Sequence, residues 1–134
     1  FDGDCFYLPP GFNTDEVKEA IVKVYKLIAK KLLINKVIDY SNQMGVMATS
    51  VKINGAKTRW GSCSTKNGIN FSWRLVMADD YVIDYVVVHE LAHIREHNHS
   101  ERFWRVVESA LPDYKSRQKK LKELQKKLAN EDWD

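Results

Sequence analysis

Cysteine and long apolar runs are scarce in this sequence, and their scarcity excludes two classes of protein. Only Cys5 and Cys63 are present among 134 residues, too few for the disulfide framework of a small secreted domain. No apolar stretch approaches the ~20 residues that a membrane-spanning helix needs, and lysines interrupt the apolar pattern of residues 13–45. We therefore expect a protein of a reducing compartment, by default cytoplasmic, that does not contact a membrane.

The beginning of the chain also lacks the pattern of a secretory signal peptide, and its first residue is Phe1 rather than Met. Residues 1–12 hold a short apolar stretch followed by Pro9, Pro10 and Gly11, which predicts a strand closed by a turn. No partner hairpin follows this strand. We therefore expect residues 1–12 to be the remnant of an upstream β-rich segment, and residues 13–134 to form one domain.

The hydrophobic period then changes from helical to strand-like, which predicts an α+β fold. After a capping pattern at Asn13 and Glu16, apolar residues recur at helical spacing, so we expect one long helix that ends at Gly45. The expected apolar stripe is Val17, Ile21, Val24, Ile28 and Leu32. In residues 46–73 the period becomes two, and the Asn67-Gly68 pair is a strong hairpin signal. This segment predicts a small three-stranded antiparallel sheet.

Helix signals return in the second half of the chain. Asp79 and Asp80 are expected to cap a helix whose residues 81–88 are apolar nearly all round, as in a helix that is buried on most sides. Ser100 is a typical N-cap residue for a further helix, and Pro112 separates that helix from a last one. The expected fold therefore has two C-terminal helices after the buried helix.

All four histidines of the chain lie within eleven residues, at positions 89, 93, 97 and 99. The HExxH pattern of residues 89–93 places the imidazoles of His89 and His93 one turn apart on one helix face, where both can reach one ion at about 2.0–2.1 Å. Glu90 projects roughly a quarter turn away, where it can contact a water bound to that ion, as a general base does. This is the zincin arrangement.

The apolar surroundings favour a metal at this pattern. A carboxylate and two imidazoles in an apolar helix are costly to bury unless a charged group satisfies them, and a divalent cation would do so. The alternative is a set of core histidines that are satisfied by hydrogen bonds. We expect the metal site.

The third ligand is either His97 or His99, and the spacing favours His99. On a straight helix His97 lies about 12 Å along the axis from His89, too far for the three imidazoles to share one ion. His99 can converge if the helix ends first, and Asn98 tolerates the left-handed conformation of a helix end. His97 is then a surface imidazole or one that supports a ligand.

The segment from Thr58 to Ser64 is unusual because Gly61 lies in the middle of an expected strand. A glycine at such a position marks a bulge or a close approach of something to the backbone. In a peptidase that partner could be the substrate, bound as an added strand along the sheet edge. The alternative is a packing anchor at Trp60 beside a simple bulge.

The last expected helix is strongly basic. Residues 115–127 hold seven positive residues and one negative residue, with an apolar stripe at Leu121, Leu124 and Leu128. The simplest interpretation is a surface helix, and the alternative is a contact with nucleic acid.

Taken together, these motifs resemble the YgjP-like metallopeptidase family, which is related to the SprT-like and WLM zinc peptidases. The matching segments are 58–64, Asn67-Gly68, 73–75, 83–93, Asn98-His99-Ser100, Phe103-Trp104 and 112–114. The resemblance implies a minimal zincin fold and a zinc peptidase with His89, His93 and His99 as ligands and Glu90 as the catalytic base. It also implies that an N-terminal β-rich segment precedes the peptidase domain.

The function that we expect is metal-assisted hydrolysis of a protein or peptide substrate, with one Zn²⁺ and with Glu90 moving the proton of the attacking water. Candidate substrate contacts are Arg59, Trp60, Gly61, Ser62 and Tyr114. The oxyanion of the reaction needs a further donor, for which Tyr114, Arg59 and Arg102 are candidates.

Two alternatives come from other classes of protein. In a structural zinc module, Cys63 would join the three histidines and close the site to water. In a nucleic-acid-associated protein, the basic C-terminal helix would recruit the domain to its target.

Overall fold

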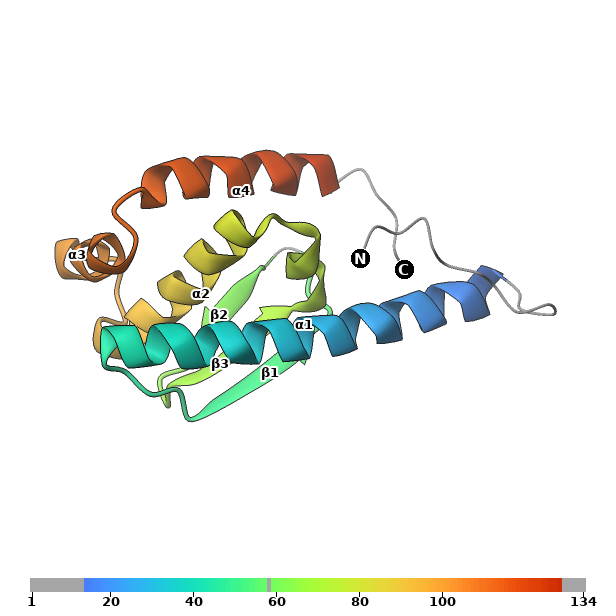
Figure 1. Cartoon of the computed structure of the whole chain (residues 1–134), viewed down its shortest axis with the longest axis horizontal. Helices are drawn as coiled ribbons and strands as arrows, with labels where there is room; N and C mark the ends of the chain where they lie inside the picture. The colour runs from blue at the N-terminus through green and yellow to red at the C-terminus, as the bar shows by residue number, and fades with distance from the viewer. Residues whose placement is uncertain (1–13, 58, 129–134) are drawn as a thin grey trace.

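The structure is a computed structural model in which residues 14–57 and 59–128 are described. It confirms the α+β class, with a long first helix and two C-terminal helices (Figure 1). The elements in chain order are α1 (Thr14–Met44), β1 (Ser50–Asn54), β2 (Gly61–Cys63), β3 (Gly68–Ser72), the 3₁₀ helix η1 (Trp73–Met77), α2 (Asp80–Arg95), α3 (Glu101–Ala110) and α4 (Tyr114–Leu128). The strand expected in residues 1–12, Cys5 and the Asn13 cap lie outside the described residues.

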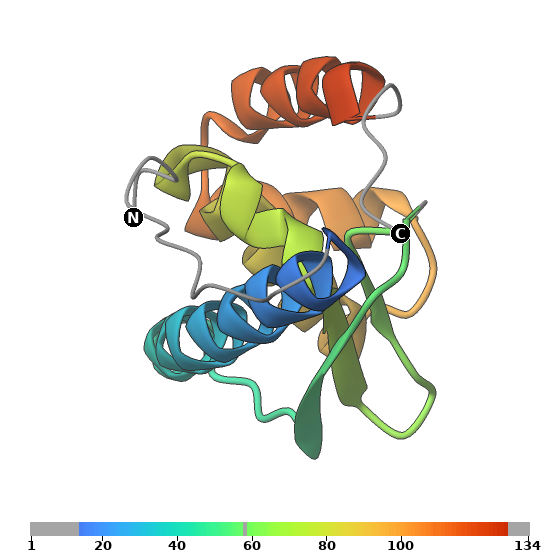
Figure 2. The ribbon, with the colours of Figure 1, turned by 90° about the vertical axis from the view of Figure 1, so that its right-hand side faces the viewer.

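Helices α1 and α2 cover one face of the sheet, with α1 over β1 and α2 over β2, and α4 packs on the side of α2 away from α1 (Figures 1 and 2). The central strand β3 points Ile69 and Phe71 into the core, where both are fully buried. Helix α2 is buried on most sides, as its apolar sequence predicts. Within the described ranges, none of the helices combines the length and the apolar character that a membrane span requires.

Helix α1 ends where the sequence predicts, but its buried face differs from the expected stripe. Gly45 follows the helix with a φ of +68°, a conformation that glycine adopts without strain. The buried residues are Ala29, Leu33 and Val37, whereas the five residues of the expected stripe are only half-buried. Ala29 and Leu33 each follow a residue of the expected stripe, so the buried face of α1 is rotated by one residue from the prediction. The first turns of α1 extend beyond the rest of the fold (Figure 1).

The sheet is mixed, so the prediction of an antiparallel sheet was wrong. β3 lies between the other two strands, parallel to β1 and antiparallel to β2. The connection between β1 and β2 therefore crosses the sheet at the C-terminal end of β3. Two side chains there hold it: Ser72 Oγ donates to the carbonyl oxygen of Ala56 at 2.7 Å, and Arg74 Nη1 donates to that of Gly55 at 2.6 Å. The period-two pattern predicts strands but not this crossing.

Turn and cap residues behave mostly as expected. The predicted hairpin turn forms, with Asn67 in the left-handed region at a φ of 65°. Ser100 caps α3, because its Oγ accepts a hydrogen bond from the backbone N–H of Phe103 at 3.3 Å. Asp79 occupies the N-cap position of α2, but its side chain makes no capping hydrogen bond, and its carbonyl oxygen accepts from Val82 and Ile83 instead.

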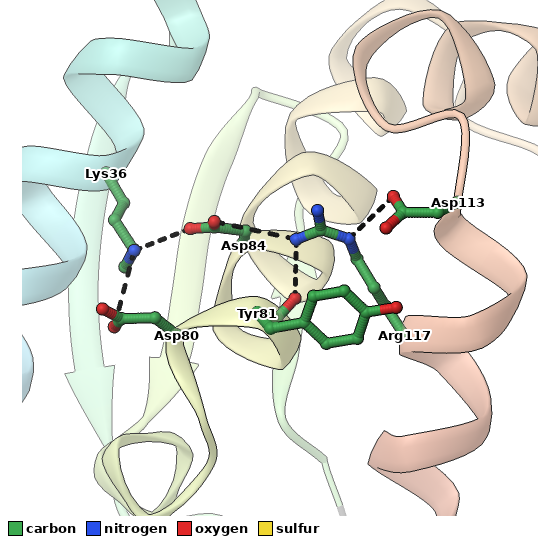
Figure 3. A network of polar contacts seen from close by, with 6 residues as sticks. All are labelled: Lys36, Asp80, Tyr81, Asp84, Asp113 and Arg117. Atoms are coloured by element: carbon green, nitrogen blue, oxygen red, sulfur yellow. Dashed lines mark hydrogen bonds and ion pairs between the residues drawn. The ribbon is translucent and has the colours of Figure 1, made fainter.

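A polar network connects three helices that are far apart in sequence (Figure 3). Asp84 of α2 lies between two cations, Lys36 Nζ of α1 at 2.6 Å and Arg117 Nη1 of α4 at 3.7 Å. Arg117 also pairs with Asp113 at 2.9 Å and donates to the carbonyl oxygen of Tyr81 at 2.8 Å. Because Lys36 and Arg117 are both largely shielded from solvent, their contacts fix α1 and α4 on opposite sides of α2.

We expect Arg74→Gln to lower the free energy of unfolding by about 2 kcal/mol, the range for a hydrogen bond to a charged group. The reason is that Arg74 is buried and holds the connection between β1 and β2. Urea denaturation measures the change. Arg105→Gln is the matched control, since Arg105 forms an exposed pair with Glu101, and we expect a change of no more than ~0.5 kcal/mol. Equal losses in both variants would contradict this account.

Candidate metal and catalytic site

Three imidazoles converge at the end of α2. His99 Nε2 lies 3.1 Å from His93 Nε2 and 3.3 Å from His89 Nε2. The three ligand atoms all lie within 4.8 Å of one another. Two ligands of a tetrahedral zinc ion at 2.0–2.1 Å are ~3.3 Å apart, so the spacing of these nitrogens fits such an ion. A single N–H on His99 can point at only one neighbour, whereas a cation is shared by all three nitrogens.

The end of α2 explains how His99 reaches the other two histidines. The helix ends at Arg95, and Glu96 is extended, with φ −135° and ψ 100°. The chain then turns back, and Ser100 begins α3 immediately after His99. The prediction of a left-handed conformation at Asn98 was wrong. In the described part of the chain the only non-glycine residue with a positive φ is Asn67, so Asn98 does not adopt that conformation. The extended Glu96 supplies the change of direction instead.

Contacts behind the imidazoles orient two of the rings. His93 Nδ1 lies 3.2 Å from the carbonyl oxygen of Glu96, and because a carbonyl only accepts, this nitrogen carries the proton and Nε2 has a free lone pair. His89 Nδ1 lies 3.3 Å from the hydroxyl of Tyr85, one turn earlier on α2. Such contacts fix the tautomer and the ring orientation of metal-binding histidines.

The side chains of Phe103 and Trp104, together called the aromatic floor, pack against the imidazoles. Phe103 of α3 is fully buried and stacks on His93 with 4.4 Å between ring centroids. It also contacts the rings of His89 and His99 edge-on at 5.0 Å. Trp104 stacks on His99 at 6.0 Å. The Ser100 cap therefore begins a helix whose first turn holds the imidazoles together.

Burial favours the neutral form of His89 and His93. It lowers the pKa of His89 to about 3, with added repulsion from the charged forms of His93 and His99. Burial is also the main cause that lowers the pKa of His93. Neutral imidazole is the form that binds a metal ion, so at neutral pH these two side chains are in the state that a ligand needs.

Glu90 lies against the sheet beside this cluster. Its side chain is 6% exposed, and burial raises its pKa to about 7, while the charge of Arg59 acts in the opposite direction. A Cβ atom added at Gly61 would lie 3.1 Å from Glu90 Cγ and 3.2 Å from both Glu90 Oε2 and Phe71 Cδ1. The close approach predicted at Gly61 is therefore made by the Glu90 side chain.

A pocket of about 210 Å³ opens beside His89 and Glu90. Gly61 of β2 and Trp60, the residue before this strand, form one wall. Tyr85 and Val86 of α2 line its base, and the opposite wall comes from α4 through Gln118, Leu121, Lys122 and Gln125. A group bound in this pocket would touch both the metal-binding cluster and the carboxylate.

The structure brings together some of the sequence-predicted residues and not others. His89, His93, His99 and Glu90 gather at one point, and Trp60 and Gly61 line the adjoining pocket. Arg59 is exposed, and its charge acts on Glu90. Tyr114 is buried and stacks on Trp104. The pocket lining does not include Arg59, Ser62, Arg102 or Tyr114.

His97 and Cys63, the two residues considered as alternative or additional metal ligands, lie outside the cluster. His97 is exposed and is not one of the three converging histidines. Cys63 is a free half-buried thiol whose Sγ lies 3.5 Å from the carbonyl oxygen of Ser64, and it is not part of the cluster either. Burial and the charge of Glu90 raise the pKa of Cys63, which disfavours the thiolate that a metal would need.

Sequence reasoning missed three features of the site. The contact of Tyr85 with His89 follows from their four-residue spacing on a helix, a signal that was available. The role of Phe103 as a floor, and the wall that α4 contributes, involve elements that are distant in sequence and carry no local signal.

Comparisons with known proteins place the chain in a family and show a similar fold. The family model described as "YgjP-like, metallopeptidase domain" matches residues 3–124, which confirms the resemblance predicted from the motifs. No curated protein sequence matches the chain. Among solved structures, the chain is similar to the metallopeptidase zymogen abylysin of Pyrococcus abyssi. That match has a TM-score of 0.61 and 23% sequence identity, and it covers 66% of this chain and 90% of abylysin; at this identity it concerns the fold. The chain belongs to the family of YgjP-like metallopeptidase domains.

Proposed function

We propose that this protein is a zinc-dependent metallopeptidase in which His89, His93 and His99 hold the ion and Glu90 is the general base. The observation that carries the proposal is the convergence of three imidazole nitrogens beside a buried carboxylate and an open pocket. Three nitrogen ligands with a fourth position left to water are the donor set of catalytic zinc sites. Bound zinc lowers the pKa of water and polarises the carbonyl group of the peptide bond.

Glu90 would move the proton. Its carboxylate, held between Gly61 and the pocket, would accept a proton from the attacking water and deliver it to the nitrogen of the leaving amine. Burial raises the pKa of Glu90, and a carboxyl group with a raised pKa takes up a proton more readily. The aromatic floor and the apolar core beneath the site would limit competing solvent on that side.

The substrate would bind along the outer edge of β2. Within the described residues β2 pairs with β3 alone, so its other edge can receive an extended peptide as an added strand. Trp60 and Gly61 line the pocket on this side and are the substrate contacts that we favour, with Arg59, Ser62 and Tyr114 as more distant candidates.

A structural zinc module has less support. Closing the site would require Cys63 as a fourth ligand, and its thiol contacts Ser64 outside the cluster. A position left open to water is the feature that separates a catalytic from a structural zinc site.

Glu90→Gln should retain zinc and lose peptide hydrolysis by at least about a hundredfold, the usual scale for a general base. The reason is that the amide cannot accept the proton of the attacking water, while the three ligands are untouched. Cleavage of an unfolded protein substrate and elemental analysis of the same sample measure both properties. Activity that survives the change would contradict the assignment of the base.

His99→Ala should leave well under one zinc ion per chain, because only two of the three converging nitrogens remain. His97→Ala is the matched control, since His97 is exposed and outside the cluster, and it should bind zinc like the unaltered protein. Zinc content after dialysis against a weak chelator gives the comparison. If zinc is retained in the His99 variant, the ligand set is wrong.

Gly61→Ala should lower kcat roughly tenfold to a hundredfold with zinc retained, because the new methyl group would displace the Glu90 carboxylate by a few tenths of an ångström or more. Gly55→Ala is the control: its Cβ would meet Trp73 at an ordinary 3.5 Å. Steady-state kinetics and zinc content distinguish the two variants. Equal activity in both would show that room for Glu90 is not what Gly61 provides.

A further inference from the structure

The pocket beside the proposed catalytic centre has one wall that comes from an element far away in the sequence. Gln118, Leu121, Lys122 and Gln125 of α4 line it. Their spacing of three and four residues puts them on one face of the helix. This face looks across the pocket toward Trp60 and Gly61, so a side chain of a bound substrate would lie between β2 and α4.

Helix α4 is fixed at its start. Tyr114 is buried and stacks on Trp104 with 5.4 Å between ring centroids. Arg117, one residue before the pocket-lining Gln118, is held by Asp84, Asp113 and Tyr81 (Figure 3). The guanidinium also lies 4.2 Å from the centroid of the Tyr81 ring. These contacts position the wall of the pocket relative to α2, which carries the proposed catalytic residues.

The charges around the pocket are unequal. Among the lining residues the charged side chains are Glu90 and Lys122, apart from the neutral His89. Arg59, which is exposed and lies two residues before β2, adds a second cation near Glu90. With Glu90 committed to the reaction, the charge left to meet a substrate side chain is positive. The volume of about 210 Å³ is below the roughly 300–1,000 Å³ of pockets for whole small molecules, and suits a single side chain.

We propose that Lys122 is a specificity-determining residue that selects peptide substrates with an aspartate or glutamate side chain next to the scissile bond. The proposal rests on the proposed peptidase function and extends it to the substrate class. The acidic side chain enters the pocket between β2 and α4, its methylene groups contact Trp60 and Leu121, and its carboxylate pairs with the Lys122 ammonium group. Gln118 and Gln125, one turn to either side, can donate further hydrogen bonds to the same carboxylate.

The test uses the zinc-loaded full chain and a peptide library prepared from a digested proteome, with cleavage sites mapped by mass spectrometry. Acidic residues should be enriched at one position beside the cleaved bond. For matched peptides with Glu or Gln at that position, we expect a threefold to fivefold higher kcat/KM for Glu, the scale of a partly exposed ion pair. The preference should weaken as salt is raised.

Lys122→Glu should abolish or invert this preference, measured as the ratio of kcat/KM for the matched Glu and Gln peptides. Lys127→Glu makes the same charge change on the same helix at an exposed residue that does not line the pocket, and it should keep the preference. The proposal is overturned if the unaltered protein shows no acidic preference, if Lys122→Glu keeps it, or if both variants lose it equally.

The two hypotheses fail in different ways. Cleavage that depends on Glu90 but shows no effect of Lys122 leaves the peptidase function intact and refutes the specificity. A complete lack of cleavage that depends on Glu90 refutes both. Binding of nucleic acid that is lost in Lys122→Glu, without any change in peptide preference, would assign Lys122 to a different partner and also overturn the proposal.

Discussion

The convergence of three imidazole nitrogens, all within 4.8 Å of one another, is the constraint on which the site depends. An N–H on His99 can satisfy only one of its two contacts at 3.1 and 3.3 Å, whereas a shared cation would satisfy the lone pairs of all three nitrogens together. Burial holds the pKa of His89 at about 3, so protonation does not relieve the arrangement near neutral pH. The ring of Phe103 packs against all three imidazoles and fixes their spacing from below. The candidate metal site therefore depends on packing at the junction between α2 and α3 as well as on the three histidines themselves.

The mixed topology of the sheet places the second half of the site. Because the connection after β1 crosses the end of β3, β2 becomes an edge strand that lies against α2. Arg74 and Ser72 hold that crossing through the carbonyl oxygens of Gly55 and Ala56. Gly61 then meets Glu90 with no room for a side chain. Glycine usually destabilises a strand, but at position 61 the lack of a side chain leaves room for the buried Glu90 carboxylate beside the histidines.

Helix α4 completes the pocket from the opposite side, and its position depends on charges in the interior of the helix layer. Asp84 accepts two cations, one from α1 and one from α4, so the long N-terminal helix and the basic C-terminal helix are held through one carboxylate. Basic residues of α4 therefore have more than one environment: Arg117 is a shielded anchor, while Lys122 faces the pocket. The sequence shows only that this helix is basic, so it does not reveal which basic side chain is an anchor and which faces the pocket.

The amino-acid sequence by itself determined the α+β class, the end of α1 at Gly45, the Ser100 cap and the family, because helix caps, periodicity and the HExxH spacing are local signals that a few neighbouring residues encode. It also pointed to His99 rather than His97, since helix geometry limits which side chains can converge. Only the tertiary structure decided the order of the strands, the stripe of α1 that is buried, the partner of Gly61 and the wall that α4 gives to the pocket. Each of these depends on contacts between residues far apart in the chain, such as Arg74 with Gly55, Arg117 with Asp84 or Glu90 with Gly61. Their physical cause is the packing of whole elements against one another, which no local pattern of residues specifies.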